Sequence, residues 1–163
     1  MVTSKERQTP PAAARFGREV CDAVAIGPLG GVATALRNCP RPMLVVTTVD
    51  MPAVRREHLN WLVEELRKDS NAAALMVQRN VDGRTVLEPF PLVCRREFLG
   101  TVEKCLAGGE RSMRGLVGLP GMVVLEAPGD WPADVWTNLN TPLDLQQYIA
   151  AIKPSGSGAA ARP

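Results

Sequence analysis

The sequence predicts an α/β fold with a mostly parallel sheet, and three observations carry this prediction. The apolar run Met43–Val49 has the length and composition of a strand buried on both faces, as strands of parallel sheets are. The segment Glu57–Lys68 places apolar residues at helical spacing, with charged residues on the opposite face. Strand-like and helix-like segments alternate along the chain, which is the order expected of an α/β domain.

The other elements follow from the same patterns. Val20–Ile26 is predicted as a short strand and Gly31–Arg37 as a small helix, which a proline-rich segment ends. Because Pro89 and Pro91 interrupt the run Thr85–Cys94, we expect an edge strand, a bulge or a loop there. The remaining expected elements are the strands Ala72–Gln78 and Met122–Leu125 and the helices Arg96–Leu106, Met113–Val117 and Leu143–Ile152.

Length and composition indicate one ordinary globular domain. We expect a single domain over residues 1–152, a polar loop or weak helix at 1–18 within it, and a flexible tail at 153–163. The net charge of +2 is spread along the chain, so neither nucleic acid nor a membrane surface is an expected partner. No apolar run reaches the roughly 18 residues of a membrane span, and the N-terminus lacks the apolar core of a secretory signal. The expected location is the cytoplasm.

The number and spacing of the cysteines and the single histidine exclude two kinds of metal site. Cys21, Cys39, Cys94 and Cys105 are too far apart in the sequence for a Cys-x-x-Cys metal site, so we expect reduced thiols, mostly packed in the interior. His58 is the only histidine, which excludes a histidine-cluster metal site. Nothing in the sequence marks it as part of a catalytic triad, and we expect a surface or half-buried helix residue.

An acid directly after a buried strand is the first sign of a functional site. Asp50 follows Met43–Val49, and open α/β sheets bind ligands at the carboxyl ends of their strands. The loop Gly27–Gly31 would let a phosphate or a base approach the backbone, and Asp22 lies shortly before it. A carboxylate facing such a loop indicates a magnesium–nucleotide site. In the plainer alternative, Asp50 caps a turn, the glycines serve packing, and Asp22 is a solvated surface acid.

Asn138 and Asn140 form a second group of candidate site residues. In an extended segment their side chains point the same way, where they could orient a phosphate, a metal-bound water or a polar substrate. Thr141 and Pro142 follow directly, and threonine before proline is a helix start signal. A capping turn before the last helix is therefore the alternative.

Together these residues resemble the molybdenum cofactor guanylyltransferase family, within the Rossmann-like nucleotidyltransferases, from about residue 19 to residue 148. The resemblance implies a three-layer nucleotide-diphospho-sugar transferase fold. In that family an Asp-Met-Pro aspartate holds magnesium, and Asp50 matches it. The other matching positions are Asp22, a nucleotide contact in the family; Gly27, Pro28, Leu29 and Gly31 for Gly-Pro-Leu-x-Gly; Glu88 to Arg95; Ser112 and Arg114; and Asn138, Asn140, Thr141 and Pro142 for Asn-x-Asn-Thr-Pro.

One part of the family pattern is absent from these 163 residues: the glycine-rich signature with its lysine, which follows the first strand. Met1–Ser4 looks like the end of the family's second strand, so a βα unit on the order of 30 residues or more is missing. Its loop would hold the triphosphate, and its strand would pair with sheet edges now left open. We expect either a start codon placed too far downstream or a degenerate relative that does not catalyse.

The resemblance implies transfer of GMP from GTP to molybdopterin or its molybdenum-loaded form, releasing pyrophosphate, with Mg²⁺ as cofactor and little activity in the truncated chain. It assigns Asp50 to Mg²⁺, Gly27–Gly31 and Asp22 to guanosine, and Asn138 with Asn140 to the acceptor or the metal shell. Molybdoenzyme maturation proteins are implied as partners, and an open sheet edge would allow self-association. A cytidylyltransferase for the same pterin, a sugar-nucleotide pyrophosphorylase and a non-catalytic binding protein remain as alternatives.

Overall fold

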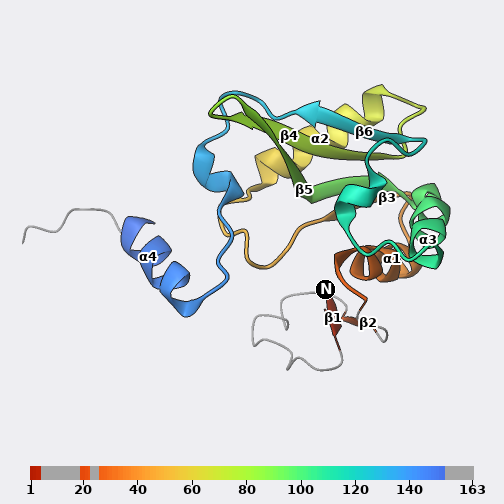
Figure 1. Ribbon diagram of the computed structural model, residues 1–163, viewed down its shortest axis with the longest axis horizontal. Coiled ribbons are helices and arrows are strands. Elements are labelled where there is room, and N and C mark those ends of the chain that lie inside the picture. The colour runs from red at the N-terminus through yellow and green to blue at the C-terminus, as the bar shows by residue number, and fades with distance from the viewer. Residues whose placement is uncertain (5–18, 23–25, 153–163) are drawn as a thin grey trace, which may run out of the picture.

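The computed structural model describes residues 1–4, 19–22 and 26–152 and has the α/β architecture that the sequence predicts (Figure 1). Most of the loop expected at 1–18 and the tail expected at 153–163 lie outside the described residues. The strands are β1 (Val2–Ser4), β2 (Val20–Asp22), β3 (Met43–Val46), β4 (Ala74–Val81), β5 (Arg84–Arg95) and β6 (Met122–Glu126). The helices are α1 (Pro28–Asn38), α2 (Arg56–Lys68), α3 (Leu99–Ala107) and α4 (Pro142–Ile152), with short 3-10 turns η2 (Arg96–Phe98), η3 (Met113–Leu116) and η4 (Ala133–Trp136).

The described strands form two sheets. Four of them lie in the order β3–β5–β4–β6, in which β5 runs antiparallel to both neighbours and β4 runs parallel to β6. β1 and β2 form a separate parallel pair. The antiparallel step from β4 to β5 is a hairpin closed by Asp82 and Gly83, both with positive φ, as the Asp-Gly pair in the sequence predicts.

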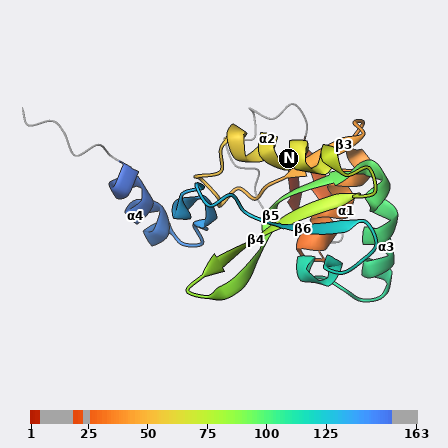
Figure 2. The same cartoon turned by 90° about the horizontal axis from the view of Figure 1, so that it is seen from above.

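Helices cover both faces of the four-stranded sheet, which gives the three layers that the resemblance implies (Figure 2). Neighbouring residues of β4 belong to two separate apolar clusters. Ala74 and Met76 pack with α1 and α3, whereas Leu75 and Val77 pack with α2. Because successive side chains of a strand point to opposite faces, the core has one half on each side of the sheet.

The prolines of β5 mark a bulge and not an edge. β5 lies between β3 and β4, so the expectation of an edge strand is wrong. Its pairing with β4 shifts between Leu75 and Val77, which lie opposite Val93 and Glu88, and Pro89 and Pro91 fall within the shifted stretch. Proline has no N–H to donate, so the ladder is interrupted where the two prolines stand. The bulge alternative is confirmed.

β3 is shorter and more exposed than its sequence predicts. The strand ends at Val46, all four of its residues are half-buried, and Val49 is 83% exposed. β3 pairs with β5 on one side, and no described strand pairs with its other edge. Both faces of β3 nevertheless contact the core, because Leu44 and Val46 pack on one apolar cluster and Met43 and Val45 pack on the other. The strand is only half-buried since no described neighbour covers its outer edge.

Two helices differ from their predictions in instructive ways. α1 begins at Pro28 and not at Gly31, because proline suits the first helical position and Gly27 turns the chain with φ 87°. The glycine-rich segment is thus the first turn of a helix. α4 begins where predicted, after Thr141, but contains no buried residue and stands apart from the sheet (Figure 1). Among the described residues, no helix has the length and apolar character needed to span a bilayer.

Candidate functional site

Asp50 lies in the turn after β3, and one of its carboxylate oxygens has no partner. Oδ1 is buried without a hydrogen bond, and so is the hydroxyl oxygen of Thr48 close by. The capping alternative does not account for this oxygen, because the residue that precedes α2 and pairs with its first turn is Arg55. An orphaned carboxylate oxygen is costly unless a cation or a donor occupies the space beside it.

The segment with the two asparagines runs beside Asp50. The backbone N–H of Leu139 donates to the Asp50 carbonyl oxygen over 2.8 Å. The connection from η4 to α4 follows the loop after β3 (Figure 1). Asn138 and Asn140 flank Leu139, and both side chains are exposed. The structure therefore places the backbone of the asparagine segment beside Asp50.

The same segment also forms the capping turn before α4, so the capping interpretation and the site interpretation are compatible. Asp144 accepts hydrogen bonds through Oδ2 from the N–H groups of Asn140 and Thr141, at 2.9 and 2.8 Å. In return the Asp144 N–H donates to the Thr141 hydroxyl at 3.1 Å. These backbone donors lower the pKa of Asp144. Sequence reasoning missed Asp144, although threonine followed three residues later by an acid is a capping signal.

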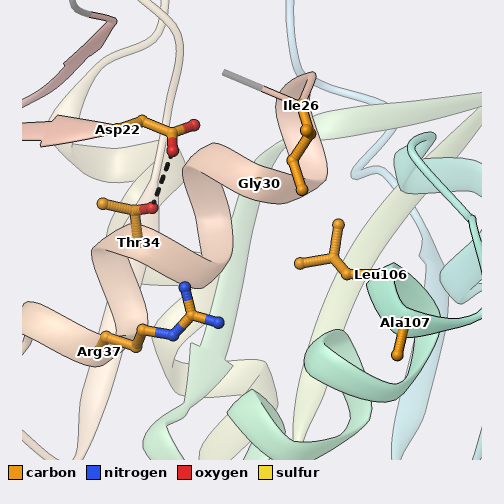
Figure 3. A pocket seen from close by; sticks show the side chains of 7 residues that line it. All are labelled: Asp22, Ile26, Gly30, Thr34, Arg37, Leu106 and Ala107. Atoms are coloured by element: carbon orange, nitrogen blue, oxygen red, sulfur yellow. Dashed lines mark hydrogen bonds between the residues drawn. The ribbon is translucent and has the colours of Figure 1, made fainter. Parts of the chain in front are cut away.

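Asp22 is buried, so the plainer alternative of a solvated surface acid is wrong. The side chain is 6% exposed, and its Oδ1 accepts a hydrogen bond from the Thr34 hydroxyl on α1 at 3.3 Å (Figure 3). The other oxygen lies close to Gly30. Asp22 lines a cavity of about 270 Å³ whose other lining residues are Ile26, Gly30, Thr34, Arg37, Leu106 and Ala107.

The residues of the glycine-rich turn, Gly27–Gly31, have different structural roles. Gly27 adopts a positive φ that disfavours other residues, and Pro28 starts α1. Leu29 is fully buried in the core below α1, so it can contact a ligand only through its backbone. A Cβ added at Gly31 would meet nothing within 4 Å, so open space lies beside the backbone there. The turn thus presents a helix N-terminus and an uncovered backbone, which suit an anion.

The described residues contain no cluster of three or more His, Cys, Asp or Glu side chains that could enclose a metal. Mg²⁺ commonly takes one or two carboxylates and completes its shell with water and substrate phosphates. Asp50, with one oxygen unsatisfied, fits that role. The site therefore suits a hard cation that arrives with its substrate.

Two other sequence predictions need correction. His58 is 4% exposed, because its ring packs on Trp131 at 4.6 Å between ring centres. The four cysteines are free thiols, as expected, but only Cys94 is buried and Cys21 is exposed. Burial raises the pKa of the Cys94 thiol to about 12.

A three-layer α/β domain with an acid after a strand and an uncovered helix N-terminus defines a class, the nucleotide-binding α/β domains. Comparison with known families identifies the member. The model of the MobA-like NTP transferase domain matches residues 1–120, so this chain belongs to that family. The match includes Asp22, Gly27–Gly31 and Asp50 and ends before the two asparagines.

Similar proteins agree with the family. A probable molybdenum cofactor guanylyltransferase of Thermococcus sibiricus (strain DSM 12597 / MM 739) is 26% identical over 94% of this chain and 76% of its own length. A protein of the same description from Opitutus terrae (strain DSM 11246 / JCM 15787 / PB90-1) is 36% identical over 63% of this chain, which spans 50% of that protein. The chain is thus shorter than the relatives it matches.

Solved structures share the fold. Molybdopterin-guanine dinucleotide biosynthesis protein A from Archaeoglobus fulgidus superimposes with a TM-score of 0.66 at 22% identity, covering 85% of this chain and 71% of that one. The 2-C-methyl-D-erythritol 4-phosphate cytidylyltransferase of Thermus thermophilus also gives 0.66, at 13% identity, covering 93% and 82%. At these identities the likeness establishes the nucleotidyltransferase fold alone.

Proposed function

We propose that this protein acts in transferring GMP from GTP to molybdopterin or its molybdenum-loaded form, with release of pyrophosphate, in the cytoplasm. The observation that carries the proposal is the juxtaposition of Asp50, with its orphaned oxygen, and the segment of Asn138 and Asn140. Guanylyltransferases are the relatives that match this chain in sequence, which supports guanine as the base and the pterin as the acceptor.

In this proposal Asp50 and the two asparagines have separate roles in the part of the site that binds the metal and the acceptor. Asp50 would hold Mg²⁺, which when bound supplies charge neutralisation on the phosphates of the nucleotide. Asn138 and Asn140 would orient the acceptor or the water molecules of the metal shell. The terminal phosphate of the pterin would attack the α-phosphorus of GTP in line, with pyrophosphate as the leaving group, so the part of the protein would be positioning and electrostatic stabilisation.

The guanosine side would be formed by the turn at Gly27–Gly31 and by Asp22. The uncovered backbone at Gly31 gives a flat group room to approach α1. Asp22 is a buried acceptor lining the adjoining cavity, so it suits the N–H groups of a guanine edge or a ribose hydroxyl.

Two observations favour a second function. The 163 residues contain no glycine-rich lysine signature, and no described strand pairs with the outer edge of β3. We therefore propose that the 163-residue chain alone transfers GMP slowly or not at all. If the protein in its own cells also lacks that signature, it would be a non-catalytic member that binds the nucleotide, the pterin or a molybdoenzyme maturation protein.

The decisive test starts with the intact mass of the protein isolated from its own cells, followed by transfer assays on that form. Asp50→Asn should lower the rate of Mg²⁺-dependent transfer by about 10²- to 10³-fold, as the loss of one electrostatic contact in an active site does. Asp130→Asn, an exposed acid outside the site, is the matched control and should keep the rate. Full activity of Asp50→Asn would refute the assignment.

Base preference and acceptor are tested separately. Titration with GTP and with CTP in the presence of Mg²⁺ should favour GTP, and a preference for CTP would replace the guanylyl proposal by the cytidylyl alternative. Nucleotide binding without transfer to the pterin, in the form isolated from cells, would favour the non-catalytic function.

A further inference from the structure

An ion pair on the β4–β5 hairpin lies next to the candidate site without belonging to it. Arg79 of β4 and Glu88 of β5 are joined by a hydrogen bond from Nε to Oε1 of 2.6 Å. Their side chains are 30% and 12% exposed, so the pair is mostly shielded from water. A shielded pair of this kind adds little net stability over apolar residues, and its clearest effect is to fix a geometry.

The geometry that it fixes is that of Trp136. The Arg79 guanidinium lies over the Trp136 ring, 5.7 Å from its centre. A guanidinium is attracted to an aromatic face and stacks on it, and a carboxylate partner fixes the orientation of the guanidinium. Trp136 ends η4, and its carbonyl oxygen accepts a hydrogen bond from the Asn138 side-chain amide at 3.4 Å. Glu88 and Asn138 are therefore connected by successive contacts through Arg79 and Trp136.

The loop that carries Asp50 is anchored in the same apolar cluster. Met51 is 6% exposed and belongs to the cluster that contains Trp136. Trp131 stacks on Trp136 at 5.7 Å between ring centres, and the ring of His58 packs on Trp131 in turn. The two loops of the candidate site thus contact one apolar cluster, and Arg79 lies over the Trp136 ring of that cluster.

We propose that Arg79, fixed by Glu88, is a positioning residue that sets the orientation of Asn138 beside Asp50. Arg79 acts through Trp136 and touches neither the nucleotide nor the acceptor. The catalytic meaning of this role rests on the proposed function, whereas the orientation of Asn138 is a property of the chain itself. Loss of Arg79 should leave the fold intact and free the Asn138 amide to sample other orientations.

The test compares Arg79→Met and Glu88→Gln with Arg84→Met, an exposed arginine on the same hairpin. In the 163-residue chain, the side-chain amide NMR signals of Asn138 should shift or broaden in Arg79→Met and less in Glu88→Gln, and stay unchanged in Arg84→Met. Unchanged Asn138 signals in both of the first two variants would overturn the proposal. Because Glu88→Gln keeps the shape of the pair, it decides the matter should Arg79→Met fail to fold.

A kinetic readout separates positioning from a loss of structure. In the protein form that transfers GMP, Arg79→Met should lower kcat roughly tenfold and leave KM for GTP near its original value, since misplacement of a reacting group slows the chemical step. In an Asn138→Ala background it should add little further loss, because both changes act through one side chain. Fully additive losses would overturn the proposal. Absence of transfer in every form, with the NMR shift present, would instead refute the proposed function and leave the positioning intact.

Discussion

Gly30 and Gly31 are adjacent in the first turn of α1, and the structure predicts opposite effects when each is replaced by alanine. A Cβ at Gly31 would meet nothing within 4 Å, whereas a Cβ at Gly30 would lie 2.7 Å from Cγ1 of Ile26 and 3.4 Å from Oδ2 of Asp22. The helix propensity gained is the same in both variants, so the comparison isolates packing between α1 and the segment that carries Asp22.

The magnitudes follow from two opposing effects. Alanine in place of glycine in a helix stabilises by roughly 0.5–1 kcal/mol, and we expect this gain for Gly31→Ala. Forcing a methyl group into filled space typically costs about 1–3 kcal/mol, which outweighs that gain in Gly30→Ala. The two variants should therefore differ in free energy of unfolding by about 1–3 kcal/mol, with Gly30→Ala the less stable.

Urea unfolding followed by circular dichroism measures the difference, and the denaturant slope m should be the same for both variants. Equal stabilities, or a more stable Gly30→Ala, would refute the packing of Gly30 against Ile26. Gly31→Ala carries a second expectation that rests on the proposed function. Its added methyl group occupies the open space beside α1, so it should weaken binding of Mg-GTP in a calorimetric titration while it stabilises the fold.

Two further predictions concern titratable groups. Because burial raises the pKa of Cys94 to about 12, its thiol should resist iodoacetamide at neutral pH until the protein unfolds, while the exposed Cys21 reacts first. Mass spectrometry of the alkylated peptides gives the order of modification. Early modification of Cys94 would contradict its burial. Burial also lowers the pKa of His58 below its usual value of 6.5, so the unfolded chain takes up this proton before the folded one does. Stability should therefore fall as the pH falls below about 6.5, and His58→Gln should lose less over that range; parallel pH curves for both proteins would count against this account.

Local patterns in the sequence predict most helices and strands, because an element's periodicity is set by its own residues. The helix at Glu57–Lys68 is found within one residue of its predicted start, at Arg56, and the Asp82-Gly83 hairpin lies where the turn residues indicate. The central place of β5 was not predictable from its own residues. Pro89 and Pro91 argue locally for an edge, and only the pairing partners on both sides turn their effect into a bulge.

For the candidate site as well, some features could be predicted from local sequence and others could not. Asp50 could be singled out because it follows a strand, and the two asparagines because they directly precede a helix start; their roles stay a prediction. The burial of Asp22 was not predictable, because it comes from the packing of β2 against α1, where Gly30 and Thr34 lie beside the carboxylate. Arg79 carries no local signal at all. The one hint in the sequence is that it contains only three tryptophans. In the fold these tryptophans contact one another, and Arg79 lies over one of them, Trp136.

The segment between η4 and α4 is held at both of its ends, and this explains how two exposed asparagines can keep a fixed place. On one side Leu139 donates to the backbone of Asp50, and on the other side Asp144 accepts from the backbone of Asn140. All of these bonds use backbone groups on the asparagine segment, so they leave the amide of Asn140 available to a ligand. The amide of Asn138 is tied more weakly, at 3.4 Å, to the Trp136 carbonyl. Because Trp136 belongs to the apolar cluster, this bond links Asn138 to the cluster, and the effect of Arg79 is expected at Asn138 for that reason.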